Sequence, residues 1–145
     1  MRDLWSAFIT WLRSDETLVT LTTHTIGDLR IYAWIPDSDL KIPSLIVICD
    51  DDELLAGRTV YDTKVNFETY HRTESISGDM IKRIRDMLVD ATTVEKRCHG
   101  PVADISDATI TIKSCEIGSI LKPVWNQDMR YWSHELSARV IWAFT

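Results

Sequence analysis

Hydrophobic side chains near the start of the chain recur at the spacing of an amphipathic helix. The apolar positions within residues 3–13 are Leu4, Trp5, Phe8, Trp11 and Leu12. A stripe repeating every three to four residues covers one helix face. Ser14 is expected to cap a second short helix, because Asp15 and Glu16 then fall in its first turn, where acidic groups are favourable. This helix would turn Leu18, Val19 and Leu21 toward the core.

Three stretches before the middle of the chain have the pattern of strands. Residues 29–34 alternate between two side-chain faces. Residues 44–49, with the sequence SLIVIC, form a continuous apolar run typical of a central strand buried on both faces. Residues 59–70 alternate again, with Val65 and Phe67 on the apolar side. The last pattern predicts a long, half-exposed strand that is antiparallel to its neighbour if a hairpin joins them.

The strongest helix signal follows Ser77, which is predicted to be its N-cap. Ile76 and Ile81 have the spacing of a hydrophobic staple, and Asp79 would lie at the positive end of the helix dipole. The apolar stripe is predicted to consist of Met80, Ile84, Met87, Leu88 and Ala91.

The last third of the chain predicts two strands. Residues 92–108 have no clear period and are expected to form either a long loop or an element with a weak sequence signal. Residues 109–117 alternate, and Gly118 and Pro123 are expected to end that strand. Residues 131–144 alternate almost to the last residue. The sequence therefore predicts one domain over residues 1–145, with an α+β fold: a mainly antiparallel sheet of about five strands with helices packed on one face.

Composition narrows the classes of function. The formal net charge of −6 argues against binding to a phosphate backbone, which needs a basic surface. The chain has no apolar run long enough to span a membrane and no secretory leader pattern. Its three cysteines, Cys49, Cys98 and Cys115, are odd in number and widely spaced, so buried thiols in a reducing compartment are expected. Six tryptophans offer core residues or interface anchors.

The sequence contains no pattern that indicates catalysis, a cofactor or a metal. Phosphate-binding loops, dinucleotide fingerprints and the common hydrolase and metalloprotease motifs are all missing. Cys98 and His99 are adjacent, but no second ligand pair follows at zinc spacing. His134 lies on the apolar face of the last predicted strand and is interpreted as a hydrogen-bonded core histidine. The chain is therefore not expected to be an enzyme.

One acidic run stands out. Asp50, Asp51, Asp52 and Glu53 follow the predicted central strand. They lack the alternating acids, central glycine and terminal glutamate of an EF-hand loop. Two interpretations remain: a solvated hairpin tip, or a loop that serves assembly or lines a pore.

The order of the predicted elements resembles that of a known family. An amphipathic helix leads to GDLRIY, a proline loop and PSLIVI. The strand VNFETY then runs into the helix GDMIKRIRDML, and the aromatic strand RYWSHELSARVIW closes the chain. This order resembles the tail-terminator and tail-completion proteins of long-tailed bacteriophages over nearly the whole length. Residues 92–108 depart from the more compact members of that family.

The resemblance implies a structural virion protein of the tail or neck, made in the host cytoplasm. It implies a ring, usually of six copies, that caps the tail tube and provides the head-joining surface. The expected partners are other copies of the chain, the major tail tube protein and the head-completion connector, with genomic DNA passing through without specific binding. Two alternatives remain open: another connector of the neck or head closure, and a small enzyme or binding module.

Overall fold

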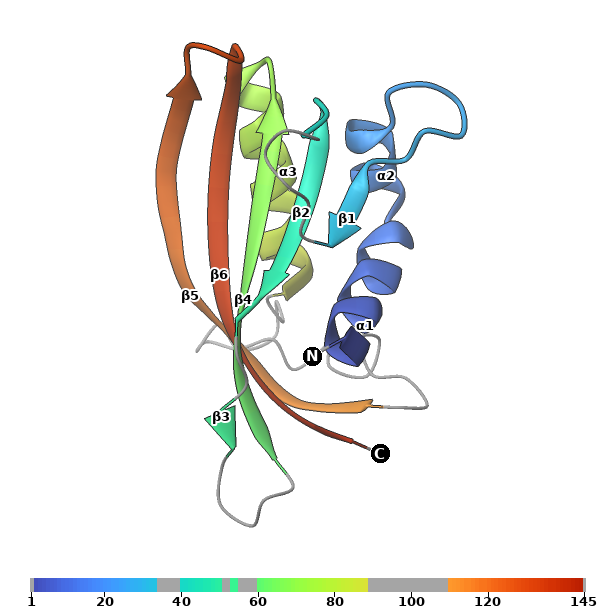
Figure 1. Ribbon diagram of the computed structural model, residues 1–145, viewed down its shortest axis with the longest axis vertical. Helices are drawn as coiled ribbons and strands as arrows, with labels where there is room; N and C mark the ends of the chain where they lie inside the picture. Colours follow the sequence, from blue (N-terminus) through green and yellow to red (C-terminus); the bar gives the residue numbers. More distant parts are fainter. Residues whose placement is uncertain (1, 34–39, 51–52, 55–59, 89–109, 145) are drawn as a thin grey trace.

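The fold is α+β, as the sequence predicts, with helices packed against one face of a mainly antiparallel sheet (Figure 1). The computed structural model describes residues 2–33, 40–50, 53–54, 60–88 and 110–144. The three helices are α1 (Arg2–Arg13), α2 (Glu16–Thr22) and α3 (Glu74–Leu88). The six strands are β1 (Ile31–Ala33), β2 (Ser44–Cys49), β3 (Glu53–Leu54), β4 (Tyr61–His71), β5 (Ile110–Asn126) and β6 (Tyr131–Phe144).

The sheet follows the order β1-β2-β4-β6-β5, and the two-residue β3 pairs with β4 off this path. β1 and β2 are parallel, and every other pair is antiparallel. β2 lies between β1 and β4 and is almost entirely buried, which confirms the prediction from its continuous apolar run. Among the described strands, β1 and β5 form the two edges of the sheet.

The core lies between the sheet and the helices. On β4 the side chains of Thr63, Val65, Phe67 and Thr69 are buried and alternate with more exposed ones, which confirms the predicted period of two. Phe67 meets Phe8 of α1 edge to face, with ring centroids 5.7 Å apart. β6 adds Leu136, Ala138, Val140 and Trp142 to the same core. The buried face of the sheet is therefore the face that the helices cover.

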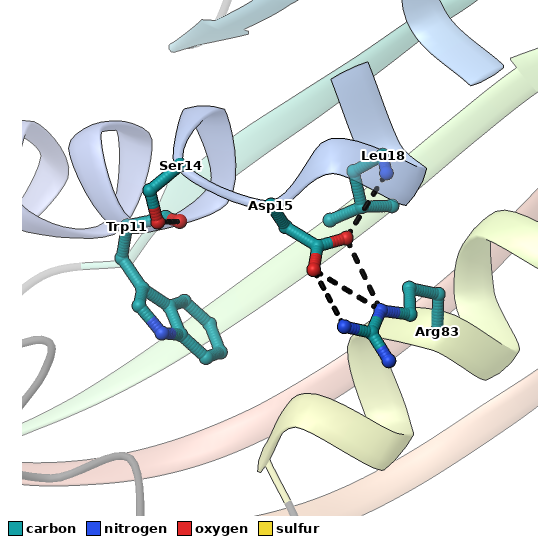
Figure 2. A network of polar contacts seen from close by, with 5 residues as sticks. All are labelled: Trp11, Ser14, Asp15, Leu18 and Arg83. Carbon is teal, nitrogen blue, oxygen red and sulfur yellow. Dashed lines mark hydrogen bonds and ion pairs between the residues drawn. The ribbon is translucent and has the colours of Figure 1, made fainter. Parts of the chain in front are cut away.

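The N-cap of α2 is Asp15, so the assignment of this role to Ser14 was wrong. The Ser14 hydroxyl donates to the carbonyl of Trp11 (2.5 Å), which closes the end of α1. The Asp15 carboxylate accepts from the backbone N–H of Leu18 (3.0 Å) and from the guanidinium of Arg83 on α3, at 2.6 Å to Nη2 (Figure 2). One carboxylate thus caps α2 and joins it to α3.

α3 begins at Glu74, three residues before the predicted cap, so the role of Ser77 as N-cap was also wrong. Ser77 lies inside the helix and is fully buried. Its hydroxyl lies 3.0 Å from the Thr69 hydroxyl and 2.9 Å from Nδ1 of His134. The apolar stripe itself is confirmed for Met80, Ile84 and Leu88.

β5 does not end at Gly118 and Pro123 but continues to Asn126. The ladder with β6 shifts register between Ile112 and Ser114, between Ile117 and Ser119, and between Leu121 and Val124. Because β5 is an edge strand, the missing N–H of Pro123 can face away from the ladder at little cost. The strand therefore tolerates both residues through local irregularities in pairing.

Several sequence predictions lie outside the described residues. These are the 92–108 loop, the Cys98–His99 pair and Ala91 at the end of the α3 stripe.

Candidate assembly surface

The hairpin of β5 and β6 carries a concentration of exposed apolar side chains. In the described part of the chain, most large hydrophobic side chains that are at least about 40% exposed lie between residues 120 and 129. We call this set the apolar hairpin; it consists of Ile120, Leu121, Val124, Trp125 and Met129, with exposures from 42% to 61%. Clustered apolar exposure of this kind marks an interaction surface more often than isolated exposed residues do.

The apolar hairpin exposes side chains on both faces of the sheet. Ile120 pairs with the core residue Leu136, and Trp125 pairs with Trp132, so both belong to the face that the helices cover. Leu121 pairs with Glu135 and Val124 with Ser133, which places them on the opposite, outer face. A helix lying on one face would leave the other face uncovered. The surface therefore suits a partner that approaches the sheet edge.

Hydrogen bonds hold the turn of the hairpin in a defined shape. The side-chain oxygen of Asn126 accepts from the backbone N–H of Met129 (3.0 Å), and its amide nitrogen donates to the Tyr131 hydroxyl (3.1 Å). Arg130 adopts a positive φ of 55°. From the end of β4, Arg72 donates to the carbonyl oxygens of Met129 (3.3 Å) and Arg130 (3.1 Å).

Aromatic and polar contacts anchor the distal part of the hairpin to the rest of the sheet. The rings of Trp125 and Trp132 lie 5.2 Å apart, and those of Tyr70 and Tyr131 lie 5.3 Å apart. Next to them, His134 bonds with Ser77, so the interpretation of His134 as a hydrogen-bonded histidine is confirmed. Its partial burial lowers the pKa of His134 and favours the neutral ring.

An open apolar hollow lies at the opposite edge of the sheet. It has a volume of about 410 Å³ and is lined by Trp5, Ser6 and Ile9 of α1 and by Ala33 of β1. Ala33 pairs with the core residue Val47, so the hollow belongs to the face of the sheet that the helices cover. We call it the α1–β1 hollow.

A second hollow, of about 330 Å³, lies on the outer face. Its lining residues are Asp62, Lys64, Gly118, Ser137, Ala138 and Arg139. Two of its charged side chains pair with each other, because the Arg139 guanidinium donates to the Asp62 carboxylate at 2.6 and 2.8 Å. Ser137 contacts Ser119, and no histidine lines the hollow.

Of the acidic run, Asp50 and the backbone of Glu53 lie within the described residues. Asp50 is exposed and still belongs to the ladder, since its N–H donates to the Lys64 carbonyl (2.9 Å). Glu53 begins β3 and pairs in register with Asp62 of β4. β2 and β3, which come directly before and at the end of the run, both pair with β4. Asp51 and Asp52 lie outside the described residues.

Other candidate chemistry contributes little to the described structure. Cys49 and Cys115 are buried thiols, as the sequence predicts. Among the described residues, no group of three or more His, Cys, Asp or Glu side chains could hold a metal ion. Within the same ranges, no helix is long and apolar enough to cross a membrane.

The apolar hairpin is the feature that the sequence analysis missed. Its signal was present, because ILKPVW is apolar around Lys122 and Pro123 and leads into a polar turn. Gly118 and Pro123 were interpreted as the end of a strand, so the apolar residues after them were not assigned to any surface.

Comparison with known proteins shows similarity at the level of solved structures. No family model matches the chain, and no curated protein matches it. A solved structure described as "Virion of native gene transfer agent (GTA) particle" contains a similar chain. The similarity has a TM-score of 0.58 at 15% sequence identity and covers 97% of this chain and 94% of the other. At this identity the likeness establishes a shared fold from end to end. The chain is thus structurally similar to a component of a phage-like virion.

Proposed function

We propose that this chain is a structural protein of a phage-like virion and that it acts as a tail terminator. Copies would form a ring that caps the tail tube and provides the surface to which the head joins. The observation that carries the proposal is the likeness to a chain of the gene transfer agent virion, which extends over nearly the full length of both chains. A shared fold alone does not give a function, so the surfaces of this chain must support the role.

The described surfaces suit assembly better than catalysis. An apolar hairpin at one sheet edge and an apolar hollow at the other provide two different contact surfaces on one small chain. When one surface of a chain binds a different surface of the next copy, the copies form a ring if the last copy meets the first. In the outer hollow the Ser137 hydroxyl contacts the Ser119 hydroxyl, and no histidine is among the lining residues. In this proposal the partners are further copies of the chain, the tail tube protein and the head-completion connector.

The net charge of −6 supports passage of DNA rather than its retention. A ring around a DNA channel must not bind the phosphate backbone tightly, and an acidic protein repels it. In this role Asp50, Asp51, Asp52 and Glu53 would recur in every copy and form one acidic band, facing either the channel or a basic neighbour.

A head-closure or neck connector is the second candidate. The description of the similar structure names the whole particle, so the same likeness supports both roles. They differ in the partner bound first: a terminator binds the end of the tail tube, whereas a connector binds the head.

The test is to mix the purified protein separately with tail tubes and with filled heads of the same virus. Electron microscopy and sedimentation then show which structure takes up the protein. The terminator role predicts rings at one end of the tubes and no binding to heads that lack tails. Binding to heads alone would establish the connector role instead, and binding to neither would exclude both roles.

A further inference from the structure

The segment between β4 and α3 joins three parts of the chain. At the end of β4, His71 pairs with Trp132 of β6 in the ladder. The next residue, Arg72, donates to the carbonyl oxygens of Met129 and Arg130 in the turn of the apolar hairpin. This short segment therefore connects the end of β4, the hairpin turn and the start of α3.

The ring of His71 completes the start of α3. Thr73 lies directly before the helix, and its carbonyl accepts from the N–H of Ser77 (3.2 Å). The N–H of Thr73 donates to Nδ1 of His71 (2.9 Å). The first N–H groups of a helix find no partner inside the helix, so a side chain that accepts from one of them stabilises the helix start. Nδ1 accepts only when it carries no proton.

A second histidine holds the same end of α3 from β6. Nδ1 of His134 lies 2.9 Å from the Ser77 hydroxyl, which lies 3.0 Å from the hydroxyl of Thr69 on β4. Nε2 of the same ring faces Gly78, since a Cβ at this glycine would lie 3.4 Å from Nε2. The ring of His134 therefore bonds to α3 at Ser77 and packs against the helix at Gly78.

We propose that His71 and His134 form a pH-sensitive contact that holds the start of α3 on the sheet. With both rings neutral, the first turn of α3 stays in place. When the rings gain protons in mildly acidic solution, this turn loosens, together with the hairpin turn that Arg72 holds. The inference goes beyond the proposed function and does not depend on it.

Protonation opposes both interactions. A proton on Nδ1 of His71 would face the N–H of Thr73, so the bond between them is lost. His134 keeps a bond to Ser77 when Nδ1 donates to the hydroxyl oxygen, but its charged ring then lies partly buried against α3. Either proton also adds a positive charge near the helix start, the end of a helix that carries positive partial charge.

The charged side chains around the two rings do not act in the same direction. Arg72 acts on His71 and disfavours its protonation. The Glu74 carboxylate of α3 acts on His134 and favours protonation, against the effect of burial. On β5, the irregular stretch opposite His134 contains Lys122, which brings another positive charge to this end of the sheet. His71 is therefore expected to contribute more to the pH dependence than His134.

The direction of the pH effect follows from the two rings. Burial lowers the pKa of His71 below its ordinary value of 6.5, and Arg72 lowers it further. Burial also lowers the pKa of His134, although Glu74 opposes this. A histidine with a lowered pKa in the folded state contributes its full stability above the unfolded value, and this contribution is lost as pH falls from there through the folded value. Both interactions are therefore complete at neutral pH and weaken below pH 6.5.

Amide hydrogen exchange measured by NMR tests the proposal. The reporting amides are those of Thr73 and Ser77 at the start of α3 and that of Met129 in the hairpin turn. Their protection, corrected for the intrinsic exchange rate, is compared between about pH 7.5 and about pH 5, the range in which histidines titrate. The reference is the amide of Leu45, which donates to the carbonyl of Arg30 (2.9 Å).

A double variant carries His71→Asn and His134→Asn. Asparagine keeps a hydrogen-bonding group near the position of Nδ1 and gains no proton in this pH range. The matched control is His24→Asn, at an exposed histidine outside α3. In the wild type and the control, acid should reduce the protection of the reporting amides several-fold, while the reference amide keeps its protection. In the double variant the same change of pH should have little effect on any of them.

An equal loss of protection in the double variant and the wild type would overturn the inference, and so would no loss in the wild type. An equal loss at Leu45 would also overturn it, because the whole chain would then be unfolding. If the double variant does not fold, NMR titration of the wild-type rings decides. Both histidines must then titrate below pH 6.5, in step with the loss of protection at the start of α3. Rings that titrate without any change at the reporting amides would contradict the inference.

Discussion

Single polar side chains join the elements of this fold. Asp15 caps α2 and bonds to Arg83 of α3 (Figure 2). Ser77 links α3 to Thr69 and His134. The cap rules assigned the cap of α2 to Ser14, one residue before Asp15, and assigned a second cap to Ser77, which lies inside α3. Such rules use only neighbours in sequence, but Asp15 is held by a residue 68 positions away. Partners this distant in sequence decide which of two adjacent polar residues becomes the cap.

Replacing Asp15 separates the two functions of its carboxylate. Asp15→Ala should lower the free energy of unfolding by about 1 kcal/mol, the usual value of an N-cap, with a further contribution from Arg83. Asp15→Asn keeps the cap but removes the charge, so it should cost less. Urea unfolding at neutral pH measures both. Equal losses in the two variants would show that the ion pair, and not the cap, supplies the stability.

The same carboxylate predicts a pH dependence. The hydrogen bond from Arg83 lowers the pKa of Asp15 below its ordinary value of 3.8. A carboxyl with a lowered pKa in the folded state stabilises the fold above its unfolded pKa and stops doing so as pH falls through the folded value. The stability difference between wild type and Asp15→Asn should therefore be full at neutral pH and shrink below about pH 3.8. A constant difference down to strongly acidic pH would contradict this assignment.

Among the helices and strands, periodicity in the sequence was enough to predict α1, β4 and β6, because each packs one apolar face into the common core. A continuous apolar run was enough to predict β2, which is almost entirely buried. The extent of β5 could not be predicted, because Pro and Gly in an edge strand cost little while looking like strand ends. The exposure of the apolar hairpin could not be predicted either, because the sequence alone does not distinguish an apolar residue in a core from one at an interface.

Ile84 tests the orientation of α3. Its side chain is fully buried at the centre of the apolar stripe, so Ile84→Asp would bury a charge without a partner. The expected loss is several kcal/mol, enough to lower the melting temperature sharply. Lys82→Asp, at an exposed position on the same helix, is the control and should melt near the wild type. Normal melting of Ile84→Asp would mean that α3 packs by a different face.

In the proposed ring, the acidic run of every copy would contribute to one band of negative charge, so its effect is expected in the assembly and not in the single chain. Changing Asp50, Asp51 and Asp52 to Asn and Glu53 to Gln keeps the side-chain sizes and removes the charge. Like charges in sequence add nothing to folding, and salt screens their repulsion. We expect unchanged melting with impaired joining of tails to heads. Normal infectivity would leave only a solvated segment, and a large loss of melting temperature would make the run structural.

The state of the isolated chain also follows from its two unlike edges. A single copy in solution keeps one hairpin and one hollow uncovered, and exposed sheet edges favour association. We predict a monomer or weak oligomer when isolated, with rings at high concentration or on the tail. Light scattering and negative-stain microscopy measure this. A stable dimer with two-fold symmetry, with and without tails, would contradict it.

The presence of the protein in purified particles tests the central claim most directly. Quantitative mass spectrometry of banded, nuclease-treated virions counts copies of this chain relative to the tail tube protein. A tail terminator predicts a small, fixed number of copies per particle, far fewer than the tube protein and equal to one closed ring. Absence from purified particles, despite expression during their assembly, would contradict the account.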